Sequence, residues 1–192
     1  MELKGKVAVV TGGNGGLGQR ICHALAKEGC HIAVVYAQSR DQAEGVAKDL
    51  QKHQVSAATF QCNVTQRNDV QKLVDDVVKR FGRLDILVND AAYNKSIPFK
   101  DLDNLTYEEW TKIIDINLTG LFLCCKYLGG AMKSGGSVIN VSSVAGHVGL
   151  VRSVPYCASK GGAELMTKSM AIDWASRGVR VNTLAPGWVD TD

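Results

Sequence analysis

Runs of consecutive apolar residues, many of them β-branched, recur along the chain and are separated by segments with a helical pattern. The runs alternate little with polar residues, which is typical of strands that are covered on both faces of a parallel sheet. Parallel strands need crossover connections, and a helix between each pair supplies them in the right-handed sense. The predicted strands are Val7–Thr11, His31–Tyr36, Ala57–Cys62, Leu84–Asn89, Ser137–Ser142 and Val179–Leu184.

Between the predicted strands, apolar residues recur every three or four positions, as on one buried face of a helix. Segment 66–81 has the clearest stripe, and we expect further helices over 19–28, 106–132 and 156–174. Strands that alternate with helices predict an α/β fold of three layers, with a doubly wound parallel sheet between two layers of helices. Ligands bind such a sheet at the carboxyl ends of its strands. The stripe of segment 66–81 consists of Val70, Leu73, Val74, Val77, Val78 and Phe81.

Length and charge narrow the classes of protein to which the chain can belong. Its 192 residues contain no internal repeat and no Pro/Ser-rich linker, so we expect one domain over residues 1–192. A formal net charge of +3 gives no support to nucleic-acid binding. No apolar run approaches the roughly 18 residues of a membrane span, and the first strand is too short for the core of a signal peptide. We therefore expect a cytoplasmic protein with neither a membrane nor a nucleic-acid partner.

Six cysteines and four histidines raise the question of disulfides or a metal site. No two cysteines form a C-x-x-C pair, and most lie in apolar runs where a thiol packs as a small hydrophobe. The histidines lack the spacing of metal ligands. We expect reduced structural thiols and no metal. The residues concerned are Cys22, Cys30, Cys62, Cys124, Cys125, Cys157, His23, His31, His53 and His147.

The first predicted strand runs directly into a glycine-rich turn, and a helix follows it. The turn reads Thr11-Gly12-Gly13-Asn14-Gly15-Gly16-Leu17-Gly18. In this position glycines let the backbone approach a pyrophosphate closely, and the N-terminus of the helix supplies N–H donors. The alternative is a tight turn without a ligand. Because the strand–turn–helix context is the one that the motif requires, we interpret the turn as part of a dinucleotide-binding site.

The end of the second predicted strand bears on the choice of cofactor. NAD-binding chains commonly place a carboxylate there, which holds the ribose 2′-hydroxyl. This chain has Tyr36-Ala37-Gln38-Ser39-Arg40 instead. No acidic side chain in it would repel a 2′-phosphate, and Ser39 and Arg40 could donate hydrogen bonds to one. The segment therefore favours NADP(H), although Arg40 can also be read as a solvated residue at the start of a helix.

Tyr156 and Lys160 lie four residues apart in a predicted helix, and therefore on the same face of it. An ammonium close to a phenol favours the phenolate and lowers the pKa of the phenol by about 1–3. Such a tyrosine could serve as a general acid and base near neutral pH. Taken alone, the Tyr-x-x-x-Lys spacing also fits an ordinary pair on the surface.

Two further polar positions lie where a reacting group could be placed. Ser142-Ser143 ends the fifth predicted strand at the ligand edge of the sheet, where a hydroxyl could stabilise charge on a substrate oxygen. Serines at strand ends also commonly form turns. Asn117 lies in the apolar stretch Ile113-Ile114-Asp115-Ile116-Asn117-Leu118, where an amide is either a satisfied core group or part of a relay.

Asn117, Ser143, Tyr156 and Lys160, together with the glycine turn, resemble the short-chain dehydrogenase/reductase family over the whole chain. The resemblance implies a Rossmann fold and hydride transfer between a nicotinamide and a carbonyl or secondary alcohol. Tyr156 would be the catalytic acid–base, and Lys160 would bind the nicotinamide ribose and tune Tyr156. Ser143 would orient and polarise the substrate oxygen, and Asn117 would hold a water that links Lys160 to solvent. Ser143 is preferred to Ser142 because the catalytic serine of the family lies thirteen residues before the tyrosine.

The resemblance also implies a set of cofactor-binding residues. The final stretch, Pro186-Gly187-Trp188-Val189-Asp190-Thr191, looks like the turn that the family places beneath the nicotinamide. The implied residues are Gly12, Asn14, Gly15, Gly16, Leu17, Gly18, Tyr36, Ser39, Arg40, Asn63, Val64, Asn89, Ala91, Tyr156, Lys160, Pro186, Gly187, Val189 and Thr191.

Two segments near the expected cofactor depart from the family pattern. Asn89-Asp90-Ala91-Ala92 stands where the family usually has Asn-Asn-Ala-Gly. The Ala92 methyl could crowd the adenosine side, and an ionised Asp90 lacks the donor of an amide. Asn63-Val64 replaces a usual Asp-Val, and we expect the contact with adenine to persist. Cofactor binding is therefore expected to be weaker than is typical of the family.

Members of the family typically continue past the Pro-Gly turn through a substrate-covering segment and a last strand, whereas this sequence stops at Asp192. We expect the domain to be incomplete at its C-terminus, without the lid that keeps water from the reaction. The Val-Tyr-Ala and Ser-Lys-Gly-Gly segments resemble NADPH-dependent 3-oxoacyl-carrier-protein reductases, and bacterial sugar dehydrogenases share much of the pattern. A catalytically weak dinucleotide-binding or regulatory protein is the alternative from another class. We expect a small-molecule carbonyl or alcohol substrate, and a homo-oligomer formed through helices 106–132 and 156–174.

Overall fold

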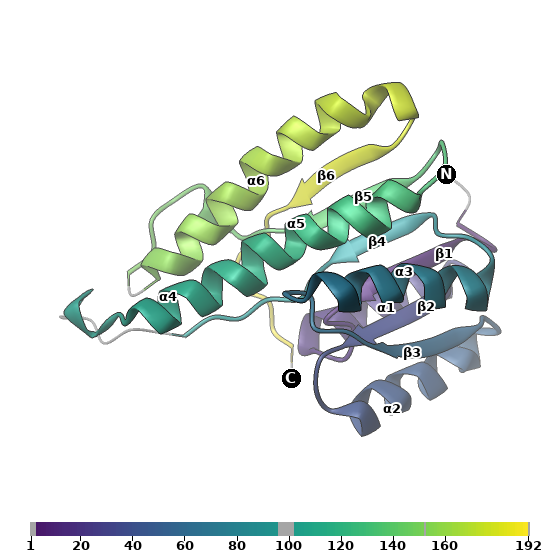
Figure 1. Ribbon diagram of the computed structural model, residues 1–192. Coiled ribbons are helices and arrows are strands. Elements are labelled where there is room, and N and C mark those ends of the chain that lie inside the picture. Colours follow the sequence, from purple (N-terminus) through teal and green to yellow (C-terminus); the bar gives the residue numbers. More distant parts are fainter. Residues whose placement is uncertain (1–2, 96–101, 152, 192) are drawn as a thin grey trace.

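Six parallel strands form one sheet in the computed structural model, which describes residues 3–95, 102–151 and 153–191 (Figure 1). The spatial order of the strands is β3-β2-β1-β4-β5-β6. All six predicted strands are confirmed, with ends within two residues of the expected ones, as is the doubly wound α/β architecture. The strands are β1 (Val7–Thr11), β2 (His31–Tyr36), β3 (Ala57–Gln61), β4 (Ile86–Asn89), β5 (Ser137–Val141) and β6 (Arg180–Leu184).

The order of the strands reverses after β3, because β1 pairs with β2 on one side and with β4 on the other. Val9 at the middle of β1 lies opposite Ala33 and Leu87. At the carboxyl end of β1, Thr11 lies opposite Asn89, the last residue of β4. The connections from β1 and β4 leave this edge in different directions, which opens a crevice for a ligand between them.

Helices cover both faces of the sheet (Figure 1). Residues of α1 (Gly16–Lys27) and α2 (Arg40–Leu50) share a hydrophobic cluster with one face. Residues of α3 (Arg67–Phe81), α5 (Gly120–Cys124) and α6 (Val154–Trp174) share a second cluster with the opposite face. The predicted three-layer arrangement is therefore confirmed.

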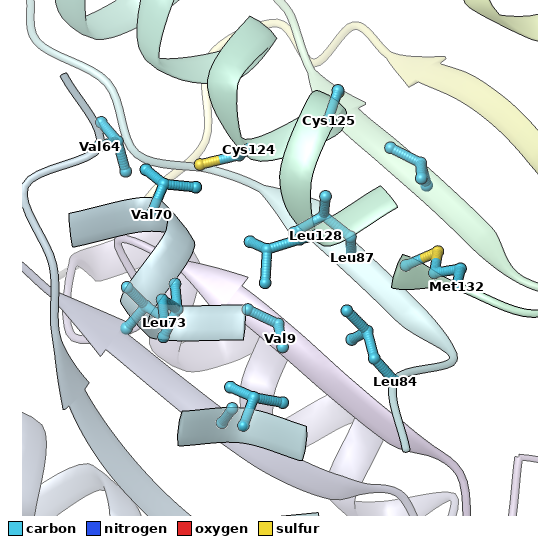
Figure 2. Close-up of a cluster of buried hydrophobic side chains, with 14 of the residues drawn as sticks. Val9, Val64, Val70, Leu73, Leu84, Leu87, Cys124, Cys125, Leu128 and Met132 are labelled. Atoms are coloured by element: carbon cyan, nitrogen blue, oxygen red, sulfur yellow. The ribbon is translucent and has the colours of Figure 1, made fainter. Parts of the chain in front are cut away.

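Alternate residues of the central strand supply the two clusters. Val7 and Val9 of β1 point to the cluster under α3, α5 and α6, part of which Figure 2 shows. Ala8 and Val10 belong to the cluster under α1 and α2. Successive side chains of a strand point to opposite faces, so a strand that is covered on both faces is apolar throughout. This is why β1 reads as a continuous apolar run rather than as an alternating one.

Five of the six cysteines are buried and pack as apolar side chains, in agreement with the sequence. Cys22 belongs to the cluster under α1 and α2, while Cys62 and Cys125 belong to the opposite one. Burial raises the pKa of each of these three thiols to about 12. A thiol with so high a pKa is protonated at neutral pH and a poor nucleophile.

The predicted long helix over 106–132 forms, but its hydrogen-bond pattern changes along its length. Thr106 caps α4 (Tyr107–Ile114) by accepting a hydrogen bond from the N–H of Glu109 at 3.2 Å. Two π-helical turns, η3 (Asp115–Thr119) and η4 (Cys125–Gly129), flank α5. The predicted long helix is therefore confirmed, and its two π-helical turns are a further feature, because periodicity does not register the wider turns that π-helices introduce.

Shorter elements and helix ends complete the described chain. Helix α1 begins at Gly16, within the glycine turn, rather than at residue 19 as predicted. In the part of the chain that the structure describes, no helix has both the length and the apolar character that crossing a bilayer would require. The 3-10 turns are η1 (Gln51–His53), η2 (Leu102–Asn104), η5 (Val144–Gly146) and η6 (Ala175–Arg177).

Candidate functional site

The glycine turn connects β1 to α1 through a backbone that leaves no room for side chains at two positions. Gly12 has a φ of 67°, in the left-handed region that favours glycine. A Cβ on Gly18 would lie 2.1 Å from the carbonyl oxygen of Gly12. The first turn of α1 therefore packs directly on the turn, and that first turn contains no acidic residue. The bare backbone and the helix N-terminus suit an anionic group such as a pyrophosphate.

A cavity of about 520 Å³ lies beside this turn, within the usual size range of ligand sites. Its walls come from the carboxyl ends of β1, β2, β3 and β4, as expected for a doubly wound sheet. Of the predicted cofactor-binding residues, those that line the cavity are Gly12, Asn14, Gly15, Tyr36, Ser39, Asn63, Val64 and Ala91.

Sequence reasoning did not find every residue of the cavity. Lys112 of α4 lines it, and its Nζ lies 4.0 Å from the centroid of the Tyr93 ring. Gln38 also lines it and accepts a hydrogen bond from the Asn14 amide at 3.3 Å through its carbonyl oxygen. The helical pattern around Lys112 gave no signal, because its place in the wall follows only from how α4 lies against the ends of the strands.

Ser39 and Arg40, the residues expected at a 2′-phosphate, begin α2. Ser39 has a φ of 61°, in the left-handed region, and it lines the cavity. The Nε of Arg40 donates to Oε1 of Glu44 at 2.7 Å, and 75% of the Arg40 side chain is exposed. Arg40 therefore has the features of a solvated residue at a helix start, and its guanidinium has a carboxylate partner.

Three side chains meet where β5 ends and α6 begins. Ser143 is the second residue after β5, and its side chain hydrogen-bonds with that of Tyr156 in the first turn of α6. One turn later, the Nζ of Lys160 lies 5.5 Å from the centroid of the Tyr156 ring and donates to the carbonyl oxygen of Val141 at 2.7 Å. Tyr156 is half-buried and Lys160 is buried. The structure thus places Ser143, Tyr156 and Lys160 together at the ligand edge of the sheet.

The expected direction of the Tyr156 pKa was wrong. Burial raises the pKa of this phenol above its ordinary value, and the hydrogen bond with Ser143 only partly opposes the effect. Cys157 and Asp90 add to the rise. The spacing of Tyr156 and Lys160 carries no information about burial, which is the larger influence here.

Asp90, which the sequence singled out as a departure, interacts electrostatically with Lys160. Burial raises the pKa of Asp90 to about 6, and the ammonium of Lys160 opposes this rise. Burial likewise lowers the pKa of Lys160 to about 8, against the attraction of Asp90. Asp90 also lines the cavity. A carboxylate and an ammonium therefore share a poorly solvated space between the cavity and Tyr156.

Asn117 lies on the π-helical turn η3 and is buried. Its Oδ1 accepts from the N–H of Tyr93 at 2.7 Å, and its Nδ2 donates to the carbonyl oxygen of Tyr93 at 2.9 Å. Nδ2 also donates to Oγ of Ser159 at 3.2 Å. The side chain thus links the segment after β4 to α6. The role of Asn117 in holding a water stays a prediction.

Asn89 belongs to a buried network between β4, β5 and the helices. Its Nδ2 donates to Oδ1 of Asn140 at 2.8 Å and contacts Sγ of Cys125 at 3.3 Å. Asn140 in turn donates to Oγ1 of Thr167 at 2.8 Å. Within the described residues, Oδ1 of Asn89 is a buried acceptor with no donor. Its amide hydrogen bonds go to the core, and Asn89 is not among the residues that line the cavity.

The stretch after β6 returns to both parts of the site. The carbonyl oxygen of Pro186 accepts from the N–H of Val144 at 3.0 Å, next to Ser143. Thr191 lies against the glycine turn, since a Cβ on Gly16 would come within 2.6 Å of the Thr191 Cβ. Four other members of the predicted set stand apart from the cavity. Gly187 and Val189 are exposed, Leu17 packs against the cluster under α1 and α2, and Arg40 is paired with Glu44.

Comparison with known proteins gives matches over nearly the whole chain. The sequence pattern of the short chain dehydrogenase family matches residues 6–192. The chain is 39% identical over 189 residues to the 3-oxoacyl-[acyl-carrier-protein] reductase of Staphylococcus aureus (strain Mu50), covering 97% of this chain and 76% of the relative. A short chain dehydrogenase of Burkholderia cenocepacia J2315, solved in complex with NADP, matches with a TM-score of 0.94 and 30% identity, over 100% of this chain and 78% of that one. An NAD+-bound xylitol dehydrogenase matches with a TM-score of 0.93 and 30% identity, over 100% and 74%.

Fold and sequence therefore point to the same class of protein. The doubly wound sheet and the glycine turn occupy the positions that the resemblance implied. The chain belongs to the short-chain dehydrogenase/reductase family and is an NAD(P)-dependent oxidoreductase of CH–OH and C=O groups.

Proposed function

We propose that this protein is an NADPH-preferring reductase of 3-oxoacyl thioesters. The observation that carries the proposal is the contact between the side chains of Ser143 and Tyr156 beside Lys160, at the edge of the sheet that also holds the glycine turn. A hydroxyl pair at this place can face a carbonyl oxygen, and the buried cation beside it can stabilise the phenolate that proton transfer leaves behind.

In this proposal Tyr156 donates its hydroxyl proton to the substrate oxygen, and it accepts that proton in the reverse direction. Ser143 donates a hydrogen bond to the same oxygen, where negative charge develops. The ammonium of Lys160 stabilises the Tyr156 phenolate, and this effect must outweigh the burial that raises the Tyr156 pKa. The amide of Asn117 holds the segment after β4 against α6 and so keeps the cavity open beside these groups.

A bound nicotinamide would supply the hydride in reduction and would receive it in oxidation. The pyrophosphate would rest on the turn from Gly12 to Gly18, and the adenosine would fill the cavity beside it. The absence of a carboxylate at the end of β2 supports NADP(H), because nothing there repels a 2′-phosphate. Ser39 and Arg40 are the proposed donors to it, and Arg40 would exchange Glu44 for the phosphate.

The proposed substrate class rests on similarity to the Staphylococcus aureus reductase, which is named for a 3-oxoacyl-carrier-protein substrate. A sugar or polyol dehydrogenase is the second candidate, supported by the similarity to xylitol dehydrogenase. The two candidate functions predict different preferred substrates. A 3-oxoacyl reductase should prefer a β-keto thioester with NADPH, and a polyol dehydrogenase should prefer a polyol with NAD+. Faster turnover of the polyol pair would favour the second candidate.

The proposal is tested by Tyr156→Phe, which removes the proton donor and keeps the ring. We expect turnover of a β-keto thioester with NADPH to fall by about 10²- to 10⁴-fold, as is typical when a general acid is lost. NADPH binding, measured by fluorescence titration, should change little. Tyr107→Phe is the matched control, since Tyr107 is exposed at the start of α4. Near-normal turnover in Tyr156→Phe would overturn the assignment of this residue.

A further inference from the structure

The loop from β5 to α6 carries the proposed catalytic Ser143 as its second residue, and a single side chain of α6 contacts the loop on both sides of that residue. Oε1 of Glu164 accepts from the hydroxyl of Ser142 at 2.7 Å, one residue before Ser143. Oε2 of Glu164 lies 3.0 Å from Nδ1 of His147, just after the turn η5. Because a carboxylate only accepts hydrogen bonds, both neighbours are donors. Glu164 therefore bridges the two ends of the short turn that carries Ser143.

The bridge is buried on one side and open on the other. Glu164 and Ser142 are both buried, whereas 60% of the His147 side chain is exposed. A buried carboxylate is costly unless its oxygens are hydrogen-bonded, and here each oxygen has a partner. The backbone of the loop also lies directly on the carboxylate, since a Cβ on Gly146 would come within 2.5 Å of Oε1. The loop and the Glu164 side chain thus fit each other closely.

The same helix holds the groups that Ser143 must meet. Tyr156, Lys160 and Glu164 follow one another at intervals of four residues, so they lie along one face of α6. Tyr156 contacts Ser143, Lys160 reaches back to Val141 at the end of β5, and Glu164 holds the loop. Three side chains on one face of α6 thus contact the end of β5 and the segment that carries Ser143.

We propose that Glu164 is a positioning residue for the reaction, and that it acts by holding the loop so that the Ser143 hydroxyl stays at Tyr156. The proposal rests on the proposed role of Ser143. Glu164 itself takes no part in proton or hydride transfer. Its contribution is hydrogen-bond geometry rather than negative charge, because both its contacts run to donors of the loop.

Because the proposed contribution of Glu164 is hydrogen-bond geometry, two substitutions of this residue should differ in their effect on kcat. Glu164→Met keeps the length of the side chain but removes both acceptors, and we expect kcat to fall about 10- to 100-fold, as misplacement of a reacting group by about 1 Å can cause. Glu164→Gln should restore kcat to within about threefold of the unchanged protein, because an amide still presents one acceptor and one donor group. Its carbonyl can accept from His147. Its NH₂ can donate to Ser142, whose hydroxyl can then donate to the carbonyl oxygen of Lys160, 3.3 Å away.

A double-mutant cycle with Ser143→Ala distinguishes positioning from a general structural role. If Glu164 acts through Ser143, the double variant Ser143→Ala/Glu164→Met should turn over no more slowly than Ser143→Ala alone. The NADPH dissociation constant should stay within about twofold in all variants, since the turn around Ser143 is not part of the cofactor cavity. Asp173→Asn, which removes an exposed carboxylate from the same helix, is the control and should leave kcat unchanged.

Multiplicative losses in the double variant would overturn the proposal, as would equal losses in Glu164→Met and Glu164→Gln. If Glu164→Met does not fold, Gly146→Ala gives the same information, because its Cβ displaces the carboxylate without removing it. Its loss of kcat must then also vanish in the Ser143→Ala background. Failure of the proposed function has a different signature: no turnover by the unchanged protein, or full turnover by Tyr156→Phe.

Discussion

Asp90→Asn should stabilise the protein at neutral pH, although it removes the charge that attracts Lys160. Burial raises the pKa of Asp90 from 3.8 to about 6, and this value already includes the opposing attraction of Lys160. Between these two pH values the folded protein holds a proton that the unfolded chain has lost. The free energy of unfolding therefore falls as the pH rises from about 4 to about 6. A difference of this size corresponds to about 3 kcal/mol, and asparagine avoids this cost because it does not ionise.

The assay is urea unfolding of the unchanged protein and of Asp90→Asn from pH 4 to pH 8. Near pH 4 the two should differ little, because Asp90 is protonated in the folded state. Above pH 6 the variant should be more stable by up to about 3 kcal/mol, and the difference should then be constant. The pKa of Lys160 should also fall further below about 8, because its attracting partner is gone. A variant that is less stable at pH 7.5, or a difference that does not vary with pH, would refute this reasoning.

Three other substitutions test the fold that supports the site. Gly18→Ala should destabilise the protein and weaken NADPH binding at least tenfold, since its Cβ would lie 2.1 Å from the carbonyl oxygen of Gly12. Gly45→Ala in α2 meets nothing within 4 Å and should raise the free energy of unfolding by about 0.5–1 kcal/mol. Thermal unfolding and NADPH titration measure both effects, and equal behaviour of the two variants would contradict the prediction. Asp85→Asn should lower the free energy of unfolding at pH 7 by about 1–3 kcal/mol, because the Asp85 carboxylate accepts from Arg83 and from the backbone, interactions that lower its pKa despite burial. Because that pKa lies below the ordinary value, the loss should disappear as the pH falls through it in urea unfolding, and a loss that persists unchanged in acid would point to packing instead.

The strands and their parallel arrangement could be predicted from the sequence because they depend on local patterns. A strand that is buried on both faces must be apolar throughout, and the run Val7–Thr11 shows this directly. The glycine turn could be predicted for a similar reason, since Gly12 and Gly18 meet each other within a few residues of chain. The π-helical turns around α5 could not, because the apolar pattern of a helix does not show where its hydrogen bonds widen to the i→i+5 spacing.

Interactions between residues far apart in the chain escaped prediction. The hydrogen bond between Asn89 and Asn140 joins positions 51 residues apart, so the sequence could not distinguish a core network from a cofactor contact. The bridge from Glu164 to Ser142 spans 22 residues and follows no motif. The pKa of Tyr156 was predicted in the wrong direction because burial is a property of the whole fold. Sequence motifs could identify the functional groups of the site, whereas tertiary packing determines the pKa values of these groups.

The parallel strands and the reversal of their order between β3 and β4 also affect the folding rate and the way in which a bound dinucleotide would stabilise the protein. Among the described residues every strand pairing is parallel and none is made through a short hairpin. Each pairing therefore closes a long stretch of chain, and folding is expected to be slow. A dinucleotide at the crevice would contact residues that precede the reversal and residues that follow it. It would then bind the assembled sheet and neither half alone, so each tenfold increase of its concentration above the dissociation constant would add about 1.4 kcal/mol to the free energy of unfolding.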